Sequence, residues 1–131
     1  SHLSDYTKSI DTPLYRVLKT CLPGPYTFVL PASKQVPKLL KSKKETIGLR
    51  VPDNVICQAI LEELGNPILS ASLPGGMVEE FTDPEIIYEI FGNQVDFVID
   101  GGPGGIIPST VIDCTTDEWV VLREGLGEWA A

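Results

Sequence analysis

At 131 residues, with 43% hydrophobic and 21% charged residues, the chain has the size of one domain with its own hydrophobic core. Its net charge of −8 argues against general nucleic-acid binding, because lysine and arginine supply most of the affinity for phosphate. No apolar stretch approaches the roughly 20 residues that span a bilayer, so no membrane partner is expected.

The cysteines indicate a reducing compartment. Cys21, Cys57 and Cys114 stand far apart, each inside an apolar run, which predicts free thiols and a cytoplasmic protein. The single histidine, His2, lies near the N-terminus. We therefore expect neither a cysteine–histidine catalytic pair nor a zinc site.

Alternating helices and strands are expected along the chain. Apolar residues at helical spacing, with caps at Thr12 and at Asp53 or Asn54, predict helices over 12–22, 35–42, 53–67 and 83–93. Short β-branched and aromatic runs predict strands over 26–30, 46–52, 68–72, 95–100, 109–114 and 118–125. The chain is thus predicted to be a single α/β domain, with 109–114 and 118–123 antiparallel.

The basic residues are concentrated in one stretch. Six of the ten lie within residues 34–50, namely Lys34, Lys38, Lys41, Lys43, Lys44 and Arg50. Residues 51–131 hold fifteen acids and one basic residue, Arg123. The lysines form either a solvated surface loop or a local patch for RNA.

The two arginines are candidate ligand groups. In the strand around Arg50, alternation places Thr46, Gly48 and Arg50 on one face, where a guanidinium beside a glycine can clamp an anion. Arg123 ends an apolar strand among acids. A salt bridge and a ligand contact are equally open for Arg123.

Small hydroxyls follow two of the predicted strands. Ser70 and Ser72 end one strand, at a position where a ligand can meet the edge of a sheet. Ser109 and Thr110 close the glycine-rich stretch 99–113, which is either a phosphate loop or a plain connection. The chain has no nucleotide-binding, metalloprotease or hydrolase signature that would decide between these alternatives.

Six short segments together resemble the YrdC/YciO family of threonylcarbamoyl-AMP synthases. They are "LPGPYTFVLPA", "TIGLRVPDN", "LGNPILSAS", "VDFVIDGG", "PSTVID" and "VLREGLG", and in this order they cover nearly all of the chain. The resemblance is greatest to the YciO-like branch. It implies a twisted mixed sheet, parallel and antiparallel, with flanking helices around a positive cavity, in a YrdC-like (RibB-like) architecture.

The resemblance also implies a reaction and a site. L-threonine, bicarbonate and ATP, with Mg²⁺, would give threonylcarbamoyl-AMP and pyrophosphate, and partner proteins would pass the threonylcarbamoyl group to tRNA. Arg50 and Arg123 match arginines at the nucleotide, Ser70 and Ser72 match the substrate pocket, and Ser109 and Thr110 match the threonine and phosphate end. The family's P-G-P-x-T stretch near the nucleotide is matched by Pro23, Gly24, Pro25 and Thr27.

Two departures from the family pattern bear on activity. The synthase branch carries Ser-x-Asn where this chain has Ser72, Leu73 and Pro74. The family's N-terminal P-T-D-T-x-Y-G-L strand and Lys-x-Arg pair have no counterpart here, so residues 1–131 are expected to be the C-terminal two-thirds of an incomplete domain. The alternatives are a module that binds double-stranded RNA or tRNA, and an enzyme that uses carbamoyl phosphate.

Overall fold

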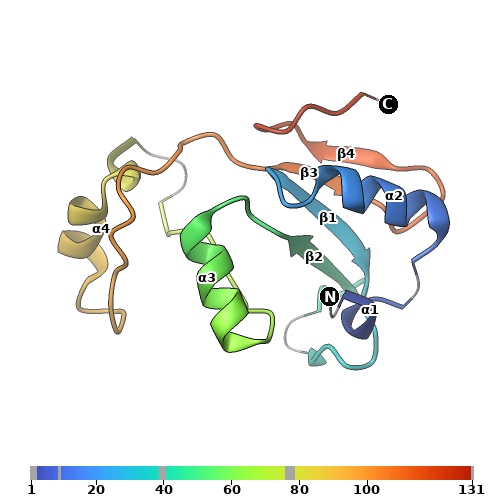
Figure 1. Cartoon of the computed structure of the whole chain (residues 1–131), viewed down its shortest axis with the longest axis horizontal. Coiled ribbons are helices and arrows are strands. Elements are labelled where there is room, and N and C mark those ends of the chain that lie inside the picture. The colour runs from blue at the N-terminus through green and yellow to red at the C-terminus, as the bar shows by residue number, and fades with distance from the viewer. Residues whose placement is uncertain (1–2, 9, 39–40, 76–78, 131) are drawn as a thin grey trace. The chain divides into compact units, whose positions relative to one another are not determined.

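Four strands form a mixed sheet in the order β2-β1-β3-β4 in the computed structural model, which describes residues 3–8, 10–38, 41–75 and 79–130. β1 (Tyr26–Pro31) lies antiparallel to β2 (Thr46–Arg50) and parallel to β3 (Thr110–Asp113) (Figure 1). β4 (Val120–Arg123) lies antiparallel to β3, as expected for 109–114 and 118–123. The mixed α/β sheet is therefore confirmed.

The chain divides into two units, each of which is described by itself. Unit 1 (Ser1–Asn66 and Ser109–Ala131) holds the sheet with α1 (Leu3–Tyr6), α2 (Thr12–Cys21) and α3 (Val55–Leu64). Unit 2 (Pro67–Pro108) holds the 3₁₀ helix η2 (Glu79–Thr82) and α4 (Pro84–Phe91). That residues 1–131 form one domain stays a prediction.

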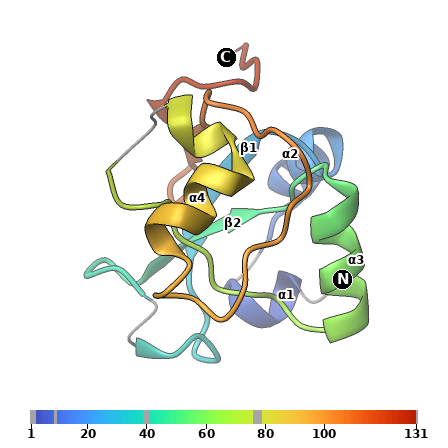
Figure 2. The same ribbon diagram turned by 90° about the vertical axis from the view of Figure 1, so that its left-hand side faces the viewer.

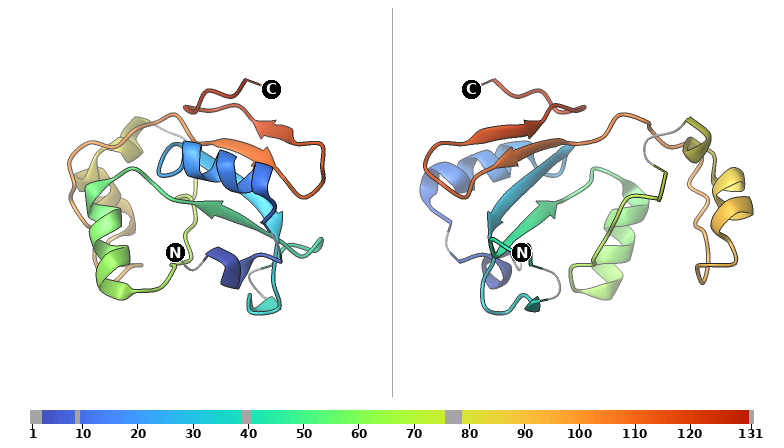
Figure 3. Two further views of the ribbon diagram at one scale, coloured as in Figure 1. Left: turned by 45° about the vertical axis from the view of Figure 1, so that its right-hand side comes forward. Right: turned by 180° about the vertical axis from the view of Figure 1, so that it is seen from behind.

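The hydrophobic core of unit 1 lies between α2 and one face of the sheet. Leu14 and Leu18, one turn apart on α2, pack with Phe28, Leu30 and Ile112, which are fully buried. The view from behind in Figure 3 shows β1 and β3 in front of α2. We call this side of the sheet the core face.

The N-terminal cap of α2 differs from the expectation. Asp11, not Thr12, has the extended backbone of a cap, and its carboxylate accepts a hydrogen bond from the Leu14 amide at 3.0 Å. Thr12 is already helical, so its side chain cannot hold the cap position. The predicted helix itself is confirmed.

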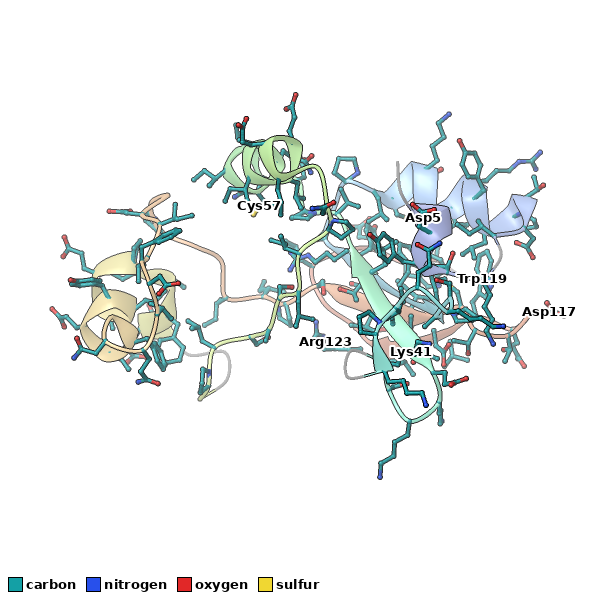
Figure 4. All side chains as sticks on the ribbon, turned by 90° about the horizontal axis from the view of Figure 1, so that it is seen from below. Asp5, Lys41, Cys57, Asp117, Trp119 and Arg123 are labelled. Atoms are coloured by element: carbon teal, nitrogen blue, oxygen red, sulfur yellow. The ribbon has the colours of Figure 1, made fainter. Side chains whose placement is uncertain are left out.

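An aromatic group extends the core face toward the C-terminus. The Phe28 ring lies 6.3 Å from Trp129, and Trp129 lies 6.3 Å from Trp119, which is labelled in Figure 4. The Tyr26 hydroxyl donates to the carbonyl of Glu128 at 2.7 Å. These contacts hold the segment after β4 against the sheet.

α3, green in Figure 2, has both predicted boundaries. The Asn54 side chain accepts hydrogen bonds from the amides of Ile56 and Cys57, each at 3.0 Å. Gly65 ends the helix in the left-handed conformation, with φ 76°, which glycine adopts without steric cost.

Unit 2 confirms the helix expected over 83–93. Asp83 caps α4 through a bond from the Glu85 amide at 2.9 Å, and the Phe81 and Phe91 rings meet edge to face at 5.6 Å. No helix in the described part of the chain is long and apolar enough to cross a membrane.

Two of the predicted strands are wrong. Residues 68–72 and 95–100 form no ladder, although both are apolar runs bounded by turn residues. A strand needs a neighbour for its backbone hydrogen bonds, and neither run is paired with one among the described residues. The helix expected over 35–42 includes Leu39 and Leu40, which lie outside the described residues, and the described residues 35–37 and 41–42 are not helical.

Candidate functional site

One row of paired residues crosses the side of the sheet opposite α2. Thr27 on β1 is paired with Arg50 on β2 and with Val111 on β3, and Val111 is paired with Arg123 on β4. Paired residues of neighbouring strands direct their side chains to the same face. We call this side, which carries the row and Gly48, the polar face.

Ser109 is held at the start of β3 by an arginine. The Nε and Nη2 atoms of Arg123 donate to the Ser109 carbonyl at 3.0 and 2.9 Å, and Nη2 also donates to the Ser109 hydroxyl at 3.1 Å. Figure 4 labels Arg123 at the end of β4. Two alternatives were open for Arg123, a salt bridge and a ligand contact. Among the described residues Arg123 forms no salt bridge, because its guanidinium donates to Ser109 instead.

Thr27 and Ser109 form a hydroxyl pair. Their oxygen atoms lie 2.7 Å apart, and either hydroxyl can be the donor. Ser109 is only 5% exposed, whereas Thr27 is half-buried. A pair of hydroxyls thus lies at the row, with Thr27 in the row and Ser109 beside it, and the deeper hydroxyl, that of Ser109, is fixed by a cation.

Arg50 lies at the other end of the row and is exposed. Among the described residues its side chain has no hydrogen-bond or ion-pair partner. A Cβ atom on Gly48 would already touch the Thr27 methyl group at 3.4 Å, so glycine keeps the sheet beside Arg50 clear of side chains. The predicted alternation is confirmed, because Leu49 packs on the core while Gly48 and Arg50 are exposed.

Thr110 belongs to the opposite side of the sheet. Its hydroxyl donates to the Gly127 carbonyl at 2.6 Å and accepts from the Gly125 amide at 3.1 Å, and the residue is 1% exposed. The structure thus separates the predicted pair: Ser109 joins Thr27 and Arg123, whereas Thr110 ties down the C-terminal segment. A ligand contact for Thr110 stays a prediction.

The segment Pro23–Gly24–Pro25 connects three strands through its backbone. The Gly24 amide donates to the Val51 carbonyl at 2.9 Å, and the Pro25 carbonyl accepts from the Thr110 amide at 3.0 Å. A Cβ atom on Gly24 would collide with the carbonyl oxygen of Cys21, so only glycine fits. These contacts position Thr27 two residues later, and a nucleotide contact by the segment itself stays a prediction.

The remaining candidates, Ser70 and Ser72, lie exposed in unit 2. Their role in binding a substrate stays a prediction. In the glycine-rich stretch of the same unit, the amides of Gly102 and Gly104 donate to the Asp100 carboxylate and the Thr82 carbonyl, at 2.9 and 2.8 Å. Those two amides are engaged within unit 2, which favours a plain connection over a phosphate loop.

Asp113 is a charged residue of the polar face that the sequence analysis did not single out. Its alternation with Val111 along β3 is the signal that could have placed it there. Hydrogen bonds from the Thr115 hydroxyl and amide, at 2.6 and 2.9 Å, hold the pKa of Asp113 below its usual value.

The donor set does not fit a magnesium ion held by the protein. Within the described ranges no three histidine, cysteine or acidic side chains cluster as metal ligands. The row offers guanidinium and hydroxyl groups, whereas Mg²⁺ prefers carboxylate and phosphate oxygens.

The comparisons with known proteins give the class of the protein. The family model Sua5/YciO/YrdC, described as "Telomere recombination", matches residues 1–125, and the chain belongs to this family. The protein of Escherichia coli K12 named "Uncharacterized protein YciO" is 50% identical over 131 residues, which are 98% of this chain and 63% of that protein.

Two further relatives extend the comparison. The Vibrio vulnificus protein named "Threonylcarbamoyl-AMP synthase" is 32% identical over 122 residues, 92% of this chain and 64% of its own length. The crystal structure of Pyrococcus abyssi Sua5 complexed with L-threonine is similar with a TM-score of 0.81 and 33% identity, over 94% of this chain and 36% of that one. The chain therefore spans less than two-thirds of each of these relatives.

Proposed function

We propose that the protein is a threonylcarbamoyl-AMP synthase of the YciO-like kind, which makes threonylcarbamoyl-AMP and pyrophosphate from L-threonine, bicarbonate and ATP in the cytoplasm. The observation that carries the proposal is the row on the polar face, where Arg50, which has no side-chain partner among the described residues, is paired with Thr27 of the Thr27–Ser109 pair. Relatives named for this activity, at 32% identity, support it. The product would serve tRNA modification by partner proteins.

The chemistry suits a site built from cations and hydroxyls. Threonine and bicarbonate give a carbamate with loss of water, and a carbamate oxygen attacks the α-phosphorus of ATP. The bond from that phosphorus to the bridging oxygen breaks, and pyrophosphate leaves. Such a reaction mainly requires positioning and neutralisation of phosphate charge, so it needs no histidine.

The residues of the row would divide this work. Arg50 presents a guanidinium fork that suits two phosphate oxygens. The hydroxyls of Thr27 and Ser109 supply hydrogen bonds to an anionic oxygen. A substrate contact by Ser70 and Ser72 is part of the proposal and rests on the family resemblance. ATP would enter as its magnesium complex, in which the metal neutralises part of the triphosphate charge.

Pyrophosphate release tests the proposal directly. The full-length protein is incubated with MgATP, bicarbonate and L-threonine, and pyrophosphate is measured with and without threonine. We expect release that depends on threonine and that Arg50→Ala abolishes. Arg16→Ala, on exposed α2 surface, is the matched control and should leave release unchanged. Release that does not depend on threonine would exclude synthase activity.

A second candidate function, RNA binding, is favoured by the exposed lysines of the β1–β2 connection. Lys34, Lys38, Lys43 and Lys44 are exposed there, in a protein that is otherwise acidic. This function predicts binding of double-stranded RNA or tRNA that weakens steeply with salt, without pyrophosphate release. Replacing Lys43 and Lys44 by glutamine would lower the salt dependence of binding in that case.

A further inference from the structure

The charges of the chain are divided unevenly along the sequence. Residues 1–50 carry nine basic and three acidic side chains, and five of those lysines lie in the β1–β2 connection, residues 32–45. Unit 2 (Pro67–Pro108) carries seven acidic side chains and no lysine, arginine or histidine. All seven acids are exposed, namely Glu79, Glu80, Asp83, Glu85, Glu89, Asp96 and Asp100. Like charges on one surface repel each other, so this surface gains from a partner of opposite charge.

One face of α4 combines this negative charge with an exposed aromatic ring. Glu85, Tyr88 and Glu89 lie three and four residues apart, so they share one side of the helix, and all three are exposed. Tyr88 is 64% exposed, whereas Phe91 packs on the Phe81 ring within unit 2. Neither carboxylate of this face has an ion-pair or hydrogen-bond partner among the described residues. We call this unpartnered surface, a tyrosine between two carboxylates, the α4 face.

A turn of opposite charge, Ser42–Thr46, ends the β1–β2 connection, and we call it the lysine turn. The Ser42 and Thr46 hydroxyls lie 2.7 Å apart, the Thr46 amide donates to the Ser42 hydroxyl at 3.1 Å, and the Glu45 amide donates to the Ser42 carbonyl at 2.9 Å. These bonds close the turn around Lys43 and Lys44, which are both exposed and form no salt bridge among the described residues. Because the turn is already ordered, binding to it costs little conformational entropy.

We propose that the α4 face of one copy of the protein docks on the lysine turn of a second copy. Two ammonium groups then meet two carboxylates, and a lysine side chain lays its methylene groups and its charge on the Tyr88 ring. Each copy carries one surface of each kind, so a closed pair of copies contains this contact twice. A nucleic acid would match the lysine turn alone, would leave the α4 face uncovered and would be repelled by the net charge of −8. Self-association of this kind does not depend on synthase activity.

Reversal of charge on the lysine turn is the first test, measured by sedimentation equilibrium of the full-length protein over a range of concentrations. We expect self-association that weakens between about 50 mM and about 500 mM salt, because salt screens exposed charges. Lys43→Glu combined with Lys44→Glu should raise the dissociation constant about tenfold or more, the change expected when a close charge pair is lost. Arg16→Glu combined with Lys19→Glu, on the exposed surface of α2, changes the net charge equally and is the control.

The matching reversal on the α4 face, Glu85→Lys combined with Glu89→Lys, should weaken self-association equally. Mixed in equal amounts, the two reversed variants should associate with each other although neither associates with itself. The acidic turn of one variant then meets the basic helix of the other, while the second contact of the pair keeps its original charges. Tyr88→Ala should also weaken association, with Tyr15→Ala, at a position 54% exposed on α2, as the control.

Four outcomes would overturn the inference. A monomer at every concentration in low salt would exclude a contact between copies, and association that survives both reversals would place the contact elsewhere. Mixed variants that stay apart, with unchanged melting temperatures, would show that the two surfaces do not meet. If the protein stays monomeric and binds double-stranded RNA only with Lys43 and Lys44 intact, the lysine turn serves RNA. Glu85→Gln combined with Glu89→Gln replaces the reversal on α4 if that reversal lowers the melting temperature.

Discussion

The two faces of the sheet differ in what their side chains do, although the same strands supply both. On the core face, Phe28 and Ile112 are fully buried under α2. On the polar face, Thr27 is half-buried and Arg50 is exposed, and the two residues are paired between the neighbouring strands β1 and β2. Alternation along a strand thus allows one short element to stabilise the fold with one set of side chains and to present polar side chains on the opposite face.

β3 shows the difference between consecutive residues. Asp113, on the polar face, has a pKa lowered by hydrogen bonds from Thr115. Burial, together with the Asp113 carboxylate, raises the pKa of the next residue, Cys114, to about 11. The polar face therefore favours the charged form of Asp113, whereas the core face disfavours the charged form of Cys114.

The largest expected effect comes from emptying the core face. Phe28→Ala should lower the free energy of unfolding by about 3–5 kcal/mol, because it leaves a cavity between α2 and the sheet. Urea unfolding measures the loss, and Leu122→Ala, at a position 58% exposed on β4, is the control. Equal losses for the two variants would show that the core does not lie under α2.

On the polar face, the loss should appear in binding and not in stability. Arg50→Ala should weaken ATP binding by about 1.5–3 kcal/mol, the range for hydrogen bonds to charged groups, and should leave the unfolding midpoint unchanged. Calorimetry measures the affinity, with Arg16→Ala as the matched loss of one positive charge. Unchanged affinity would remove Arg50 from the site.

Thr110 tests whether neighbouring hydroxyls have separate roles. Thr110→Val should lower the free energy of unfolding by about 1–3 kcal/mol, because the Gly127 carbonyl and the Gly125 amide lose their partner. ATP affinity should change little, in contrast to Ser109→Ala. The two faces would not be functionally separate if Thr110→Val weakened binding without loss of stability.

The smallest expected effect is on acid stability. Because the pKa of Asp113 is lowered in the folded state, its contribution is complete above its unfolded pKa of about 3.9 and is lost as the pH falls through the folded pKa. Thr115→Val removes the hydroxyl donor and should raise the pKa of Asp113, as measured by NMR titration of its carboxyl carbon. Thr116→Val, whose hydroxyl bonds Glu118, should not raise it.

Local sequence signals predicted most elements of unit 1 correctly. The caps and spacing of α3 and the alternation along β2 are properties of a few neighbouring residues. The errors at 68–72 and 95–100 have a common cause, since strand pairing depends on residues distant in the sequence. Their apolar side chains stay exposed, for example Leu69 at 76% and Phe97 at 74%.

The residues of the candidate site can be proposed from the sequence, but their arrangement cannot. Arg50, Thr27, Ser109 and Arg123 were all candidates, yet no pattern shows that Thr27 lies opposite Arg50 or that Arg123 binds Ser109. Strand register fixes the pairing of Thr27 with Arg50. A register shift between Val111 and Ile112 accompanies the binding of Ser109 by Arg123. Both depend on the assembled sheet.

The aromatic group near the C-terminus gives the protein a built-in optical label. Both tryptophans of the chain, Trp119 and Trp129, belong to unit 1 and pack against its core, and unit 2 has none. Intrinsic fluorescence excited at the indole band therefore reports the unfolding of unit 1 alone. Far-ultraviolet circular dichroism also includes α4, so a difference between the two melting curves would reveal whether the units unfold together.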